Sequence, residues 1–415
     1  MSETADALQE CFRTEWPVLM GAVARMVGDL HAAEEIVQDA MVSALGRWPF
    51  TGVPDRPGAW LMTAARNRAR NYLRDAARQR TRLNAVPPLP EGDLEEPPAI
   101  EDDRLRLMFV SCHPLLGPDA QAALTLRWVA GLSTRQIARG FLQPEATVAQ
   151  RIVRAKRTLA ESGAGFAVPA PGEWAERLPG VLRVVYLIFN EGHTAGEGDD
   201  LTRPDLCDEA LRLGRLLAEL VPAEPEVHGL LALMAYTASR LPARTDSQGD
   251  IVVLADQDRS RWDRALIQAG DGALRRAEAL AGAERGPLTL QGAIAGIHAR
   301  APSWEATDWA ALVALYDRLS ETAPSDVVAL NRAVAVAMAS GPRAALPALD
   351  DLVDAGSLGH YHLLWATRAD LLRRAGRPGE AIADYDRALQ LVHNVAEERF
   401  LAARRAQCAA EAGIA

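Results

Sequence analysis

Two clusters of arginine are the residues whose type and spacing suggest a chemistry. Residues 66–82 contain seven arginines with a single acid, Asp75, and residues 127–157 contain six arginines and Lys156 with a single acid, Glu145. Guanidinium groups bind phosphate, and a local basic face matters more for this than the net charge, which is −10 for the whole chain. The clusters therefore predict nucleic-acid binding by an acidic protein. Lys156 is the only lysine, and we expect no particular function for it.

A second candidate for chemistry is the segment 190–193, Asn-Glu-Gly-His, which Asp199 and Asp200 follow closely. This combination could suggest a metal site or an acid–base site. However, no second His or Cys stands at a spacing typical of metal ligands, and the four cysteines lie far apart. We therefore predict no catalytic residue, no metal and no cofactor, and expect residues 190–193 to form a turn between helices.

The first arginine cluster is expected on the third helix of an N-terminal helical segment. Asp29 is suited to cap the second helix, in which apolar residues follow at helical spacing as far as Trp48. Three prolines between residues 49 and 57 predict a loop. In the third helix, Trp60 and Tyr72 are expected on the inward side, with arginines four residues apart on the other faces.

The second cluster is expected on a helix–turn–helix. Residues 133–136, Ser-Thr-Arg-Gln, match a capping box that begins a helix, and Pro144 suits the first position of the next helix. In that next helix the expected buried stripe is Val148, Ile152, Ala155 and Leu159. A basic, amide-rich second helix can enter the major groove, where Arg reads guanine and Gln reads adenine.

Composition places the chain among globular proteins. Its 415 residues are 49% hydrophobic and 24% charged, which excludes a wholly disordered or collagen-like chain. The apolar runs are shorter than the roughly 20 residues that a spanning helix needs, and the acidic N-terminus does not resemble a signal peptide. Separated cysteines fit a reducing compartment. We expect a cytoplasmic, all-α protein that does not contact a membrane.

The expected organisation has six parts. Residues 1–86 and 105–162 are the two helical units, and residues 87–104 form an acidic, proline-rich linker. That linker is either a solvated spacer or an acidic decoy for a basic site. Residues 163–178 form a second linker, followed by helical extensions at 179–300 and 301–415. The segment 241–263 interrupts the helical pattern as a small hairpin or an ordered loop.

The C-terminal part contains one clear repeat unit. Six residues match the positions of a 34-residue tetratricopeptide-like unit, namely Trp365, Ala369, Gly376, Ala381, Tyr385 and Ala388. A single unit cannot bury its own apolar face, so it must stack on neighbouring helices.

Motif blocks along the chain resemble those of a known family. Residues 33–40, Trp48, 59–61 and 64–74 resemble region 2 of a bacterial sigma factor of the extracytoplasmic-function class, and residues 131–138 with 147–155 resemble region 4. Residues 181–193, 257–263, 330–336 and 361–364 resemble the group with a large, tetratricopeptide-like C-terminal extension. The resemblance covers nearly the whole chain and implies a protein that binds core RNA polymerase and reads a promoter.

The resemblance also implies roles for individual residues. The helix from Ala32 to Trp48 would dock on the β′ subunit of core polymerase, with β as a further partner. The polymerase-binding residues would be Glu34, Glu35, Gln38 and Asp39. The residues on the separated minus-10 bases would be Arg66, Asn67, Arg68, Arg70, Asn71, Tyr72 and Arg74. The residues on the minus-35 duplex would be Thr147, Gln150, Arg151, Arg154 and Arg157.

The extension is expected to bind a protein or peptide, or the chain's own sigma regions, and to regulate transcription in cis. A different function stays open, namely a helix–turn–helix regulator or tetratricopeptide-like adaptor that never joins polymerase. The docking helix favours the sigma factor, because a plain regulator has no need of residues 33–40 before an arginine-rich helix. An enzyme ranks third.

Overall fold

A computed structural model of the chain describes residues 8, 11, 14–83, 102–141, 143–162, 173–193, 202–247 and 249–413. Within these ranges the protein consists of helices, with one isolated β-bridge between Thr245 and Ile251. The all-α prediction is therefore confirmed. None of the described helices is long and apolar enough to cross a membrane. The chain forms two compact units, residues 1–187 and 188–415.

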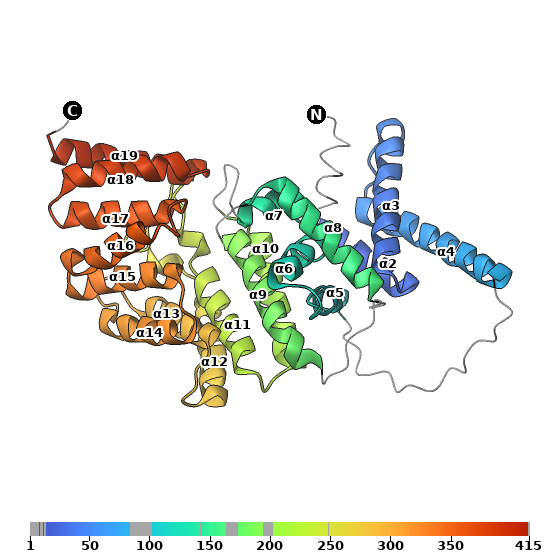
Figure 1. Ribbon diagram of the computed structural model, residues 1–415, viewed down its shortest axis with the longest axis horizontal. Coiled ribbons are helices and arrows are strands. Elements are labelled where there is room, and N and C mark those ends of the chain that lie inside the picture. The colour runs from blue at the N-terminus through green and yellow to red at the C-terminus, as the bar shows by residue number, and fades with distance from the viewer. Residues whose placement is uncertain are drawn as a thin grey trace. The chain divides into compact units, whose positions relative to one another are not determined.

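The first unit begins with a bundle of three helices, which we call the first bundle: α2 (Trp16–Val27), α3 (Leu30–Thr51) and α4 (Pro57–Leu83) (Figure 1). Asp29 caps α3 as predicted, because its Oδ1 accepts hydrogen bonds from the amides of His31 and Ala32 at 2.7 and 3.0 Å. The expected loop is shorter than residues 49–57, since α3 continues through Pro49 to Thr51. A proline in the last turn removes only one helical hydrogen bond, which a packed helix tolerates.

A second bundle completes most of the unit: α5 (Asp103–Ser111), α6 (Pro118–Trp128), α7 (Thr134–Gly140) and α8 (Glu145–Glu161). The capping box at the start of α7 is confirmed, because the Ser133 amide donates to Gln136 Oε1 at 2.9 Å and the Gln136 amide donates to Ser133 Oγ at 3.2 Å. Pro144 is the N-cap of α8 and not its first residue. The predicted buried stripe of α8 is confirmed: Val148, Ile152, Ala155 and Leu159.

Helix α9 (Trp174–His193) begins in the first unit, inside the segment 163–178 that the sequence assigns to a linker. Residues 163–172 lie outside the described part. The Trp174 and Phe109 rings are 5.9 Å apart between centroids, and Arg177 Nη1 donates to the Phe109 carbonyl at 3.1 Å. A Cβ on Gly180 would lie 2.7 Å from Gln121 Oε1, so α9 packs closely against the second bundle.

The second unit is a succession of helices. They are α10 (Pro204–Leu220), α11 (Pro225–Ala238), α12 (Arg264–Ala281), α13 (Pro287–Arg300), α14 (Trp309–Thr322), α15 (Asp326–Ser340), α16 (Pro342–Ala355), α17 (His362–Arg374), α18 (Pro378–Leu391) and α19 (Val395–Glu411). From α14 to α19 each helix packs on the next, and Figure 1 shows them as successive layers. The interruption at 241–263 is an ordered loop with two short 3-10 helices, Leu241–Ala243 and Arg259–Arg261.

The repeat residues lie where a stacked helix pair requires them. Ala369 of α17 and Ala381, Tyr385 and Ala388 of α18 are buried in the core that α15 to α19 share. Gly376 sits between α17 and α18 with a φ of 82°, a backbone conformation that glycine adopts without the steric penalty of a Cβ.

Candidate nucleic-acid interface

The polar face of α3 carries the four residues expected to bind polymerase. Glu35, Gln38 and Asp39 are exposed. Glu35 Oε1 lies 3.6 Å from His31 Nε2, one turn away along the helix. Asp39 Oδ2 lies 3.9 Å from Arg68 Nε on α4. These three side chains form an accessible, largely acidic strip along α3.

Glu34 differs from its three neighbours because it is buried, with 4% of its side chain exposed. Its Oε1 accepts a hydrogen bond from Lys156 Nζ at 2.6 Å, and its Oε2 accepts one from Trp128 Nε1 at 3.2 Å. Lys156 therefore makes a structural contact that the sequence analysis did not predict. No sequence pattern indicated this contact, since its partners are 122 residues apart.

The outer face of α4 carries most of the residues expected to bind the minus-10 element. Six are exposed: Arg66, Asn67, Arg70, Asn71, Tyr72 and Arg74. Arg70 donates to Asn67 Oδ1 at 3.1 Å, and Arg74 donates to Asn71 Oδ1. Each amide thus orients an arginine one turn along the helix. The exposed set combines fixed positive charge with amide groups and one aromatic ring.

Tyr72 and Trp60 differ in burial, although the sequence placed both inward. Tyr72 is 41% exposed, so the inward prediction is wrong for it, and its ring is available for stacking. Trp60 is half-buried, and its ring meets the buried Trp48 edge-on at 5.6 Å between centroids. The core is built by smaller residues of α4, Leu61, Ala65 and Ala69.

Arg68 does not join the outer face of α4. Its side chain is half-buried, and its Nη2 donates to Ser43 Oγ on α3 at 2.6 Å. With Asp39 also near its Nε, Arg68 links α4 to α3. In this arrangement it is less available to phosphate than Arg66, Arg70 or Arg74.

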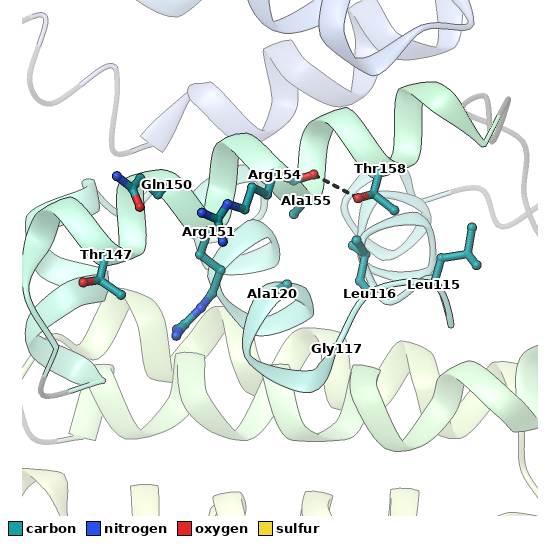
Figure 2. A pocket seen from close by; sticks show the side chains of 10 residues that line it. All are labelled: Leu115, Leu116, Gly117, Ala120, Thr147, Gln150, Arg151, Arg154, Ala155 and Thr158. Carbon is teal, nitrogen blue, oxygen red and sulfur yellow. Dashed lines mark hydrogen bonds between the residues drawn. The ribbon is translucent and has the colours of Figure 1, made fainter.

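The second basic face lies on α8 and borders a hollow of about 330 Å³. Thr147, Gln150 and Arg154 are exposed along α8. Figure 2 shows them with Arg151 on one wall of the hollow, opposite Leu116 and Ala120. The helix–turn–helix therefore presents an amide and two guanidinium groups on neighbouring turns, the groups that read base edges in a major groove.

Two arginines of α8 already have acidic partners. Arg151 Nη2 lies 3.7 Å from Asp119 Oδ2 on α6, and the other oxygen of Asp119 lies 3.5 Å from Arg183 Nη2 on α9. Arg157 Nε donates to Glu161 Oε1 at 2.6 Å on the exposed side of α8. The Arg157–Glu161 pair is exposed, and exposed ion pairs contribute little, so a phosphate can displace Glu161.

The segment 190–193 is the last turn of α9 and not the expected turn between helices. Arg244 Nη1 lies 2.8 Å from His193 Nδ1. Burial, reinforced by Arg244 and Arg240, holds the pKa of His193 well below its usual value. A Cβ on Gly192 would lie 2.7 Å from the Cys207 amide nitrogen. These contacts pack α9 against its neighbours.

No cluster of potential metal ligands occurs among the described residues. Asp199 and Asp200 lie outside that part of the chain.

Comparison with known proteins matches three separate segments of the chain. Sigma-70 region 2 matches residues 11–79, Sigma-70 region 4 matches residues 106–159, and a family of unknown function (DUF6596) matches residues 177–278. An uncharacterized protein of Rhizobium meliloti (strain 1021), R00370, is 42% identical over 406 residues, which are 95% of this chain and 94% of the relative. The chain belongs to the sigma-70 family, as a factor of the extracytoplasmic-function type with a C-terminal helical extension.

Proposed function

We propose that this protein binds core RNA polymerase, through the β′ and β subunits, and directs initiation at promoters with specific minus-10 and minus-35 elements. The observation that supports this most is that α4 and α8 expose basic faces in two different bundles. The arginines of α4 would bind the backbone of separated strands, and stacking on Tyr72 would contribute about 1–3 kcal/mol per base. The face of α8 would read duplex DNA.

The exposed strip on α3 is the proposed contact with polymerase. Glu35→Arg reverses one charge at an exposed position of this strip. We expect this variant to lose co-purification with core polymerase and run-off transcription from the promoter of its own operon. Glu321→Arg, an equal charge reversal at an exposed residue of α14, is the matched control and should behave as wild type.

The same experiment separates the proposal from the alternative, a DNA-binding regulator that never joins polymerase. A regulator would bind the promoter fragment equally well with Glu35 or Arg at position 35, and neither chain would retain polymerase. If wild-type protein fails both co-purification and run-off transcription, the alternative replaces the proposal.

The helical extension is proposed to regulate this activity in cis. The relevant comparison is the full chain with a chain that ends after residue 187, because α9 up to that point packs on the second bundle. A chain that ends after residue 162 would also lose Trp174 and Arg177 and is a poor test. Equal transcription by the full chain and the residue-187 truncation would contradict regulation by the extension.

A protein or peptide ligand is proposed for the extension, in a hollow of about 240 Å³ between α12, α13 and α14. Arg275, Arg285 and Arg300 line it together with Asp271 and Glu278. Charges of both signs around an apolar floor suit a peptide better than a simple anion. Changes in the NMR chemical shift of Arg275, or in its cross-linking, on addition of cell extract would show that such a ligand binds. For the whole protein we propose a cytoplasmic location without membrane contact.

A further inference from the structure

Glu34 and three side chains around it form the centre of a contact between region 2 and region 4. We call Glu34, Gln38, Trp128 and Lys156 the Glu34 cluster. Glu34 and Gln38 belong to α3 of region 2, whereas Trp128 ends α6 and Lys156 lies on α8 of region 4. Both carboxylate oxygens of Glu34 are used, because Gln38 Nε2 also donates to Oε1 at 3.3 Å. Every hydrogen bond of the cluster thus ends on one buried carboxylate.

Close packing surrounds the Glu34 cluster. Trp16 of α2 and Trp128 of α6 are each 1% exposed, and the Arg127 guanidinium lies 5.5 Å from the centre of the Trp16 ring. Burial lowers the pKa of Arg127, and Glu34 opposes that shift. The indoles of Trp16 and Trp128, the Arg127 guanidinium and the Glu34 carboxylate are therefore packed together where the two regions meet.

A second contact lies where α2 meets α5. Arg25 of α2 forms an ion pair with Asp103 at the start of α5. A Cβ on Gly21 would lie 2.5 Å from the Cβ of Asp103, so α2 and α5 approach as closely as a glycine allows. Regions 2 and 4 therefore meet along two adjoining surfaces.

This arrangement cannot engage both promoter elements. Elements named minus-10 and minus-35 are about 25 base pairs apart, which is roughly 85 Å of B-DNA at 3.4 Å per base pair. Regions 2 and 4 are in direct contact here, with Lys156 Nζ at 2.6 Å from Glu34 Oε1. Residues 84–101 connect α4 to α5, and a fully extended chain of that length reaches about 60 Å. This connection therefore does not hold the two regions in contact, and they can move apart.

Building on the proposed function, we propose that this is a resting state in which region 4 inhibits the polymerase-docking helix. Lys156 and Trp128 hold Glu34 inside the interface, where polymerase cannot reach it. Core polymerase competes with region 4 for this side of α3, and docking requires the Glu34 cluster to break. The only lysine of the chain is then the residue that sets how often the protein is open.

The test uses the full chain and Lys156→Gln, which removes the charge and keeps a similar length. We expect faster amide hydrogen exchange in α3 and α8, and roughly three- to tenfold tighter binding to core polymerase, because a larger open fraction raises apparent affinity. Trp128→Phe removes the indole donor and should act in the same direction. Lys156→Arg keeps the charge and should stay near wild type.

Arg404→Gln on α19 is the matched control for the lost charge, since the Arg404 guanidinium donates to Gln407 of its own helix. It should change neither exchange nor polymerase affinity. Unchanged exchange in Lys156→Gln, or faster exchange with unchanged or weaker polymerase binding, would overturn the inhibitory role of region 4. If neither wild type nor any variant binds polymerase, the proposed function itself fails, whatever the exchange shows.

Discussion

Arg154 is the residue of α8 best placed to test minus-35 recognition. It is exposed beside Gln150, and among the described residues its guanidinium forms no ion pair, unlike those of Arg151 and Arg157. We expect Arg154→Ala to weaken binding to promoter duplex by about 1–3 kcal/mol if it contacts a base. If it contacts only phosphate, the loss is similar for all sequences, and the salt slope falls by about one.

Fluorescence anisotropy with promoter and scrambled duplexes at several salt concentrations measures both effects. Arg404→Ala on α19, which removes an arginine of the second unit, is the control for lost net charge. An equal loss for Arg404→Ala would show that overall charge and not the face of α8 determines binding.

Single residues show where sequence patterns reach their limit. Helical spacing correctly separated the buried stripe of α8 from its polar face, because burial within a helix follows a period of 3.6 residues. It could not reveal that Glu34 lies inside an interface, since the burial comes from Trp128 and Lys156, far along the chain. Packing of α4 against α3 was not predictable either: it buries small residues of α4 instead of Tyr72, and it ties Arg68 to Ser43.

His298 gives a prediction for pH. Burial, with Arg240 and Arg259 nearby, lowers the pKa of His298 from 6.5 to about 4. The unfolded chain therefore binds more protons than the folded chain between these values, so the free energy of unfolding falls as pH drops from 6.5 towards 4. His298→Gln should remove this contribution, which is about 1–3 kcal/mol.

Urea unfolding at pH 7 and pH 5, with hydrogen exchange as the probe of the second unit, measures the free energy of unfolding of wild type and of His298→Gln. His360→Gln, at an exposed histidine of the same unit, should leave the pH dependence as in wild type. If the free energy of unfolding depended on pH equally in wild type and His298→Gln, His298 would not be the cause of that dependence.

At the scale of elements, the first part of α9, up to residue 187, belongs structurally to region 4. Trp174 is 8% exposed and packs on Phe109 of α5. Trp174→Ala would leave a cavity, and we expect it to destabilise region 4 by about 2–4 kcal/mol. Faster hydrogen exchange in α5 and α6, with region 2 less affected, is the measurement.

Trp174→Phe keeps most of the ring contact, so region 4 should lose much less stability in this variant. Equal exchange in α5 for wild type and Trp174→Ala would show that region 4 does not need α9, and a truncation after residue 162 would then be a fair test of the extension.

Element boundaries were predictable where a local signal exists. The caps at Asp29 and at Ser133–Gln136 fixed the starts of α3 and α7, because these side chains bond to amides within their own turn. The start of α9 was missed because the Gly-, Ala- and Pro-rich composition before it hides a helix that region 4 stabilises. The segment 190–193 was predicted to be a turn, whereas it continues α9, and Gly192 allows close packing on Cys207.

At the scale of the whole molecule, charge is segregated between parts with different functions. The net charge is −10, yet α4 and α8 expose arginines along one face each. This segregation was visible in the sequence and is why a negative net charge did not exclude DNA binding. The contact between regions 2 and 4 was not visible, because it depends on how two independently recognisable motifs pack together.

The stacked extension predicts that damage in one unit stays local. Leu364 of α17 is fully buried in the core shared by α15 to α19, whereas the adjacent Leu363 is 41% exposed. Because stacked helix pairs depend mainly on their nearest neighbours, Leu364→Ala should destabilise residues 326–411 by about 2–5 kcal/mol. Hydrogen exchange in α2 to α8 should stay at the wild-type rate, and Leu363→Ala should change neither unit by more than about 0.5 kcal/mol. Faster exchange in α3 or α8 of Leu364→Ala would instead show that the extension stabilises the contact between regions 2 and 4. Transcription by that variant would then measure directly how the extension regulates the sigma regions in cis.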